Sequence, residues 1–187
     1  GPTGELFEPL GALTHADAVD AFREQIRGLK KGGIDVVWIE TMSAPEEMQT
    51  ASEAAIAENM PFVFTASFDT AGKTMMGMHP RDIHKVADGL AQKPFAVGAN
   101  CGVGASDILA SLLDMTDAEP SANVIVKGNC GIPEFRGSEI YYSGTPELMS
   151  EYARLAIDGG ARIIGGCCGT SYIHLAAMRK AIDGHHR

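Results

Sequence analysis

Three cysteines stand in glycine-rich segments that directly follow short apolar runs. Two are adjacent in Gly165-Gly166-Cys167-Cys168-Gly169-Thr170, and the third lies in Val97-Gly98-Ala99-Asn100-Cys101-Gly102. Packing explains poorly a strand that delivers two adjacent thiols and then turns through glycine into a helix. Thiolates are good ligands for zinc, and three of them with one open position are typical of a catalytic site. The sequence therefore predicts a metal site built from Cys101, Cys167 and Cys168.

Two other uses of the thiols are less favoured. A disulfide between neighbours would need a strained eight-membered ring, and a chain without secretory features fits a reducing compartment. A fourth cysteine, Cys130, lies in Gly128-Asn129-Cys130-Gly131-Ile132-Pro133 and could reach the same metal. Four cysteine ligands would make a closed structural site. We favour an open site without Cys130.

The elements that must position these thiols alternate regularly between strand and helix. Near-continuous apolar runs predict buried parallel strands, and amphipathic patterns predict helices between them. The predicted strands are 34–39, 62–66, 95–99, 123–127 and 161–164. The predicted helices are 15–31, 45–59, 80–92, 104–115, 146–158 and 172–182. This order predicts a single α/β domain over residues 1–187, either an open doubly wound sheet or part of a (β/α)8 barrel.

In either architecture, the carboxyl ends of the strands form the functional edge. The thiols lie at that edge, and so does Glu40, which follows Val36-Val37-Trp38-Ile39. Two interpretations of Glu40 are equally favoured. It either caps the helix that follows, or it sits at the mouth of the sheet and holds a substrate ammonium group.

Composition excludes several classes of partner. The net charge is −9 and the basic residues form only short groups such as Arg179-Lys180, so nucleic acid is not expected to bind. No apolar run approaches the ~20 residues that cross a bilayer, so a membrane partner is not expected either. With 45% hydrophobic residues, the chain can bury a core. We expect a cytoplasmic, globular protein.

Together these segments resemble the zinc-dependent homocysteine S-methyltransferase family, which includes the betaine-homocysteine methyltransferases. The resemblance rests on Gly98-Ala99-Asn100-Cys101-Gly102 and Gly165-Gly166-Cys167-Cys168-Gly169-Thr170, and it covers nearly the whole chain. Supporting segments are Trp38-Ile39-Glu40-Thr41 and Gly128-Asn129-Cys130-Gly131-Ile132-Pro133. The resemblance implies a (β/α)8 TIM-barrel fold. It also implies that Zn2+ is held by Cys101, Cys167 and Cys168 and that Glu40 binds the substrate amino group.

Counted against the family barrel, the five predicted strands correspond to strands four to eight. We therefore expect a homocysteine-binding domain that is truncated at its N-terminus. The edges left by the absent strands would favour association into a homo-oligomer.

The implied reaction transfers a methyl group from a small donor to the homocysteine thiolate and gives methionine. No catalytic residue separate from the metal site is expected. Betaine is the favoured donor, because the chain has no cobalamin or folate module and resembles the betaine-using branch. Two alternatives stay open: a zinc-stabilised binding module without turnover, and a barrel enzyme that binds phosphate at the glycine-rich loop before the last helix.

Overall fold

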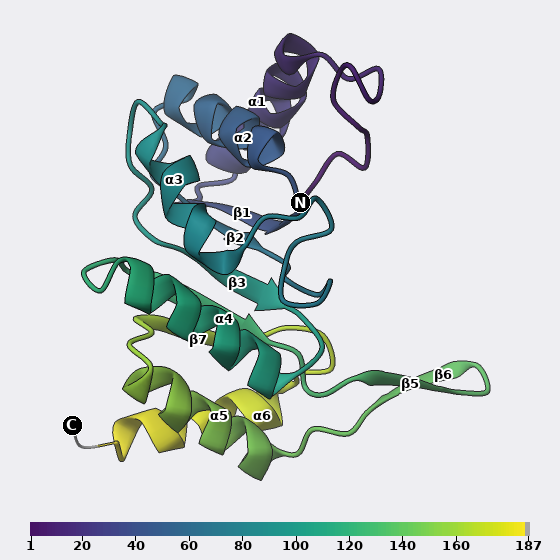
Figure 1. The fold of residues 1–187 in the computed structure, drawn as a ribbon, viewed down its shortest axis with the longest axis vertical. Coiled ribbons are helices and arrows are strands. Elements are labelled where there is room, and N and C mark those ends of the chain that lie inside the picture. Colours follow the sequence, from purple (N-terminus) through teal and green to yellow (C-terminus); the bar gives the residue numbers. More distant parts are fainter. Residues whose placement is uncertain (186–187) are drawn as a thin grey trace.

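The computed structural model describes residues 1–185 of the chain. Its centre is a five-stranded parallel sheet with the order β1-β2-β3-β4-β7 (Figure 1). The strands are β1 (Val37–Met42), β2 (Phe62–Ala66), β3 (Val97–Cys101), β4 (Val124–Gly128) and β7 (Ile163–Gly166). Because the spatial order follows the chain order without reversal, the sheet has the arrangement of neighbouring strands in a (β/α)8 barrel. A doubly wound sheet would reverse direction at a switch point. The predicted barrel-type fold is confirmed.

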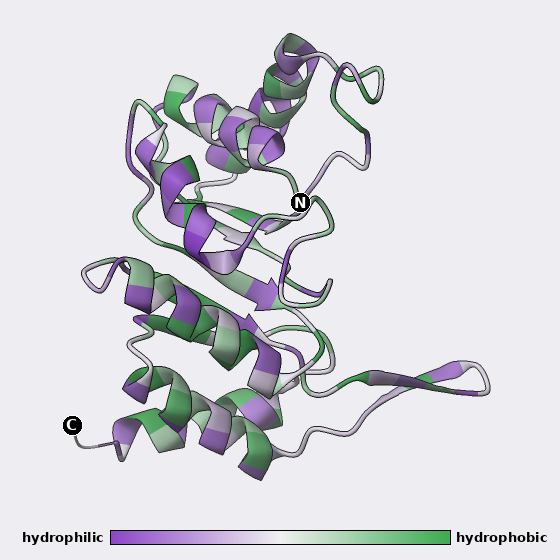
Figure 2. Cartoon of the chain, viewed as in Figure 1, coloured by the Kyte–Doolittle hydropathy of each residue, from purple (hydrophilic) through white to green (hydrophobic). Residues whose placement is uncertain are grey.

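Helices precede, connect and follow the strands of this sheet. They are α1 (His15–Lys31), α2 (Pro45–Ala57), α3 (Ile83–Asp88) after the short 3-10 helix η1 (Pro80–Asp82), α4 (Ala105–Ala118), α5 (Pro146–Asp158) and α6 (Tyr172–Asp183). Figure 2 shows hydrophobic and hydrophilic residues mixed along them, as expected for helices with one buried face. Within residues 1–185, every helix is too short or too polar to span a bilayer.

Local signals explain where several helices begin. The hydroxyls of Thr14 and Thr145 accept hydrogen bonds from Asp17 N and Leu148 N, so they cap α1 and α5. Both helices have the predicted bounds. In contrast, α2 is capped by Ala44 without a side-chain hydrogen bond, and Pro45 with its fixed φ starts the helix.

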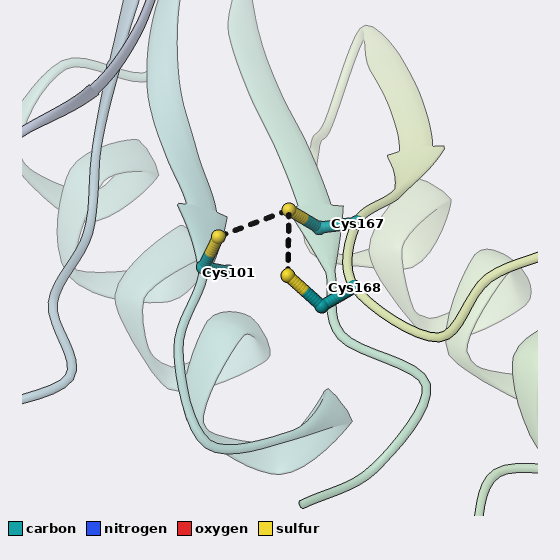
Figure 3. Close-up of side chains that lie close together, drawn as sticks. All are labelled: Cys101, Cys167 and Cys168. Carbon is teal, nitrogen blue, oxygen red and sulfur yellow. Dashed lines mark hydrogen bonds between the residues drawn. The ribbon is translucent and has the colours of Figure 1, made fainter. Parts of the chain in front are cut away.

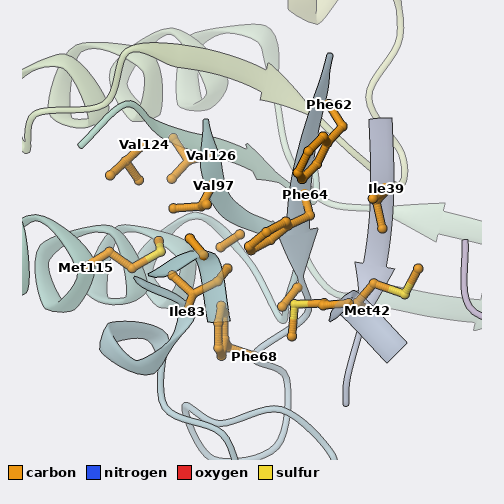
Figure 4. Packing of buried hydrophobic residues seen from close by; sticks show 14 of the residues in the cluster. Ile39, Met42, Phe62, Phe64, Phe68, Ile83, Val97, Met115, Val124 and Val126 are labelled. Carbon is orange, nitrogen blue, oxygen red and sulfur yellow. The ribbon is translucent and has the colours of Figure 1, made fainter. Parts of the chain in front are cut away.

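The main core lies between one face of the sheet and the helices. Strand residues such as Phe64, Val97 and Val126 point toward Ile83 and Met115 (Figure 4). The helices α2, α3, α4 and α5 lie in the connections between sequential parallel strands, and such connections are right-handed, which places their helices on one face of the sheet.

Residues that alternate with these core positions occupy the opposite face of the sheet. Val63, Ala96 and Ile125 form a small second cluster there, with Ile163 packed against them. By the same alternation, polar residues closer to the carboxyl edge share this face, which corresponds to the interior of a barrel. They are Glu40, Thr65, Asn100 and Lys127.

Several bounds differ from the prediction. The predicted helix 80–92, for example, is η1 followed by α3, which ends at Asp88. The strands run further than their apolar residues do, so Glu40 lies within β1, and Asn100 and Cys101 close β3. Hydrogen bonds between parallel strands join backbone groups only. They therefore continue past the point where the side chains become polar. In addition, a hairpin of β5 (Pro133–Arg136) and β6 (Glu139–Tyr142) projects from the body (Figure 1) where a loop was expected.

Candidate metal centre

The three predicted thiols form one cluster at the carboxyl edge of the sheet. The sulfur of Cys101 lies 2.9 Å from that of Cys167, which lies 4.0 Å from that of Cys168 (Figure 3). All three sulfurs are within 4.8 Å of one another. The backbone sets this geometry, because Gly128 pairs with Cys101 on one side and Gly166 on the other, and Cys167 N donates to Gly128 O at 2.8 Å.

Contact between the thiols changes their acidity. A hydrogen bond from Cys101 lowers the pKa of Cys167 to about 5, because the shared proton stabilises the Cys167 thiolate. The same bond and partial burial raise the pKa of Cys101. The contact thus favours a thiolate at Cys167, while a metal would have to release the remaining protons.

The arrangement fits a thiolate-bound metal. Zn–S bonds of about 2.3 Å at tetrahedral angles place sulfurs about 3.8 Å apart. Cys167 and Cys168 already have this spacing, and Cys101 would move outward by roughly an ångström. Cys168 is exposed and the other two sulfurs are only partly buried, so a fourth ligand has access from solvent.

Asn100 holds the Cys101 side of the cluster. Its amide nitrogen donates to Cys101 Sγ at 3.2 Å and to Thr41 Oγ1 at 2.7 Å. Its oxygen accepts from Thr41 N at 3.0 Å and from Thr65 Oγ1 at 2.7 Å. Asn100 is 1% exposed and fully engaged, so it fixes Cys101 relative to β1 and β2. The sequence did not reveal this role, although Asn100 stands beside Cys101 in the motif.

Asn129 connects the two cysteine segments. Its amide nitrogen donates to Gly102 O at 2.7 Å, and its oxygen accepts from Cys168 N at 3.0 Å. Cys101 and Gly102 have φ values of 61° and 75°, a left-handed turn that needs such support at the non-glycine residue. Asn129 is therefore the second positioning residue that the sequence alone did not reveal.

Cys130 does not join the cluster. It is fully buried, and its thiol donates to Gly144 O at 3.2 Å. Burial raises its pKa, which disfavours the thiolate that a metal requires. Its backbone serves the site instead, since Cys130 N donates to Cys168 O at 2.9 Å.

Glu40 stands apart from the thiols and forms an ion pair with Lys127. Their side chains are 35% and 24% exposed. Lys127 also lies over the Trp38 ring, with Nζ 5.0 Å from the ring centroid, at a distance suited to a cation–π contact. The helix-capping interpretation of Glu40 is wrong, because Glu40 lies inside β1 and α2 is capped by Ala44.

Tyr142, the last residue of β6, lies beside Cys168 at one side of the thiol cluster. Its ring packs so closely on Gly169 that a Cβ at position 169 would overlap it. Burial and the neighbouring Cys168 sulfur raise the pKa of Tyr142, which keeps its hydroxyl protonated.

The chain is similar to a known protein family and to solved structures. The profile of the family described as Homocysteine S-methyltransferase matches residues 1–182. Among solved structures, the apo form of the homocysteine methyltransferase MmuM from Escherichia coli superposes with a TM-score of 0.72 at 21% identity, covering 91% of this chain and 58% of that chain. Its oxidized form gives 0.67 at 24% identity, covering 87% and 52%. This chain thus spans little more than half the length of those proteins and shares their fold.

Proposed function

Because the chain belongs to the homocysteine S-methyltransferase family, we propose that it carries the thiol-activating site of such an enzyme. Its reaction would transfer a methyl group from a small donor to the sulfur of homocysteine and give methionine. The observation that carries the proposal is the approach of three thiols from two strand ends to within 4.8 Å. Residues 1–187 would form the homocysteine-binding domain.

The resident metal proposed for this site is Zn2+, held by Cys101, Cys167 and Cys168. When bound, it would lower the pKa of a substrate thiol and present it as a thiolate at neutral pH. The chain's own residues orient the ligands: Asn100 holds the Cys101 sulfur and Asn129 holds the Cys168 backbone. Glu40 is the proposed partner of the substrate ammonium group.

The charge of the site favours a cationic methyl donor. Three thiolates outweigh the charge of a divalent metal, and the whole chain has a net charge of −9. A sulfonium or quaternary ammonium donor would therefore be attracted, and its neutral product would leave more readily. Among such donors we propose betaine.

Neither alternative function gains support from the structure. The closed structural site would need Cys130, whose thiol is buried against Gly144 O. The phosphate site would need the loop before α6, but the two thiols of that loop belong to the cluster of three thiols.

A donor screen tests the proposal. The intact protein, reconstituted with Zn2+, would be incubated with homocysteine and betaine, S-methylmethionine, a dimethylsulfonium acid or methyl-corrinoid. We expect one of the cationic donors to give methionine, and we expect that donor to be betaine. If methionine formed only with methyl-corrinoid, betaine would be wrong as the donor and a methyl-corrinoid would be the donor instead. No methionine with any donor, from protein that retains its metal, would reject the function.

A further inference from the structure

A cavity of about 420 Å³ lies beside the end of β1, outside the thiol cluster. One wall is the segment before α1, which Figure 1 shows as a loop that stands out from the body. The start of α2 and the methionines Met75 and Met76 form the other walls. β2 separates this place from β3, which ends at Cys101. The volume suits a small molecule, because ligand sites usually measure about 300–1,000 Å³.

Large apolar side chains line the cavity and are exposed to solvent. Leu10 and Met75 are 74% and 75% exposed, and Leu6 and Met76 are exposed as well. Single exposed apolar residues are common on protein surfaces, but four around one cavity form a patch that a ligand can cover. Covering them removes apolar surface from water, which favours binding.

Hydrogen bonds hold the loop in place. Leu10 N and Gly11 N donate to Phe7 O at 3.0 and 2.9 Å, which closes the loop into a turn. Thr3 N and Thr3 Oγ1 both donate to Glu47 Oε1 at 2.7 Å, which joins the loop to α2. The cavity is therefore formed before any ligand binds.

The charges around the cavity are all negative. Among the described residues, four glutamates line it, but no lysine, arginine or histidine does. The glutamates are Glu5, Glu8, Glu46 and Glu47. None of the four forms an ion pair within residues 1–185. Because like charges repel one another, a cation in the cavity would relieve this repulsion.

Glu47 gives the strongest reason for a cationic ligand. It is 4% exposed, and the uncharged Thr3 is the only hydrogen-bond partner of its carboxylate in the part of the chain that the structure describes. A buried carboxylate without a cation costs free energy. A positive group beside Glu47 would lower that cost.

A metal ion fits this cavity less well than an organic cation. Metal sites bring several ligand atoms close together, and the thiol cluster is the one such group of three or more within the described residues. Separate carboxylates around apolar side chains suit a larger cation whose body is apolar.

We propose that this cavity binds a small organic cation with an apolar body, such as an arylalkylammonium ion. The body would pack on Leu6, Leu10, Met75 and Met76, and the charge would lie near Glu47. The inference goes beyond the proposed function, because the site uses none of the three thiols and needs neither zinc nor homocysteine.

Calorimetric titration of the intact protein with three probes tests the charge preference. The probes are 4-phenylbutylamine, 4-phenylbutan-1-ol and 4-phenylbutanoate, which share one apolar body and are positive, neutral and negative at neutral pH. We expect the amine to bind at least about 10-fold more tightly than the alcohol, and the acid to bind least. Added salt should weaken the binding of the amine and not that of the alcohol. Equal affinities for the amine and the alcohol, or no binding of the amine, would overturn the proposal.

Two variants test the location. Glu47→Gln keeps an oxygen that accepts from Thr3 but removes the charge, so it should weaken the amine about 10-fold and the alcohol little. Leu10→Ser removes an apolar contact and should weaken both probes. Glu53→Gln on α2 and Leu113→Ser on α4 are matched controls, because neither residue lines the cavity. Both controls should leave all three affinities unchanged.

Unfolding temperatures near the wild-type value in both variants show that the fold is intact. If Glu47→Gln unfolds, Leu10→Ser still tests the site, because the Leu10 side chain is exposed. Amine affinity that is unchanged in Leu10→Ser would place the binding elsewhere and overturn the proposal, and so would amine binding that disappears in Cys168→Ala. Sedimentation of the protein without probes tests a second copy as the occupant. A dimer that Leu10→Ser dissociates, and that takes up no amine, would replace the cation by that copy.

Discussion

The sulfur of Cys101 lies 2.9 Å from the sulfur of Cys167, although 66 residues separate the two along the chain. β4 lies between the strands that carry them, and Gly128 at its end pairs with residues of both neighbours. Each thiol reaches toward the other across the end of this strand. The cluster therefore depends on strand register, and a change at any of the three strand ends should affect the metal site.

The cysteine ligands give the most direct prediction. Replacing Cys101, Cys167 or Cys168 by Ala should abolish zinc retention and methionine formation together, because two thiolates hold the metal too weakly. Metal analysis after dialysis, beside an activity assay, measures both effects. Cys130→Ala is the control and should leave metal content nearly intact. Full activity after loss of any one cluster cysteine would contradict the assignment.

Asn100 should matter for both stability and metal affinity. Asn100→Ala leaves the buried Thr65 hydroxyl and the Thr41 amide without their acceptor, each at a cost of about 1–3 kcal/mol. Loss of the bond to Cys101 should lower zinc affinity about 10- to 100-fold, as for other residues that orient metal ligands. Chelator competition measures the affinity, and denaturant titration measures the stability.

The exposed Asn123 provides a matched control, because its amide donates only to Phe95 O, away from the cluster. Asn123→Ala should leave zinc affinity unchanged. An Asn100→Ala protein with wild-type zinc affinity would show that Asn100 supports the fold and not the metal ligands.

Gly169 should tolerate no side chain. Gly169 and Gly72 both have left-handed φ values, 78° and 75°, but only at Gly169 would a Cβ overlap a neighbour, the Tyr142 ring. Gly72→Ala should cost about 1–2 kcal/mol from backbone strain. Gly169→Ala should cost about 1–3 kcal/mol more and reduce zinc retention.

Combining Gly169→Ala with Tyr142→Ala checks the cause of that difference. Removing the ring should relieve the overlap, so the double variant should be more stable than the sum of the single effects predicts. Strict additivity in denaturant titrations would mean that the ring does not press on residue 169.

The ion pairs of Glu58 with Arg23 and Arg27 should make the stability of the fold depend on pH in the acid range. Hydrogen bonds and charge from Arg23 and Arg27 lower the pKa of Glu58 in the folded protein. A lowered folded pKa means that the stabilisation is fully present above the unfolded value of about 4.3 and is lost as the pH falls through the folded pKa. Glu58→Gln should lower the unfolding temperature at pH 7, and the difference from wild type should shrink below about pH 4. A constant difference across this range would exclude the ion pairs as its source.

Much of the fold follows from local patterns. The periodicity of residues 15–31 and 146–158, with a threonine cap before each, predicts helices that the structure reproduces with the same bounds. The predicted ends of the strands at the site lie several residues before the observed ends. The apolar residues stop before the backbone hydrogen bonds do, and β3 therefore includes the polar Asn100 and Cys101. The hairpin was missed although Gly137, with a φ of 65°, allows a two-residue turn between alternating residues.

The sequence by itself determined the alternating strands and helices, the family resemblance and the three thiols, because glycine-rich motifs and periodicity are local properties. Tertiary structure alone decided that Cys130 is buried away from the cluster, that Asn100 and Asn129 hold the cysteine segments, and that Glu40 faces Lys127. These relationships join residues on different strands. Their distances depend on strand order and register, which backbone pairing sets only when the whole sheet has formed.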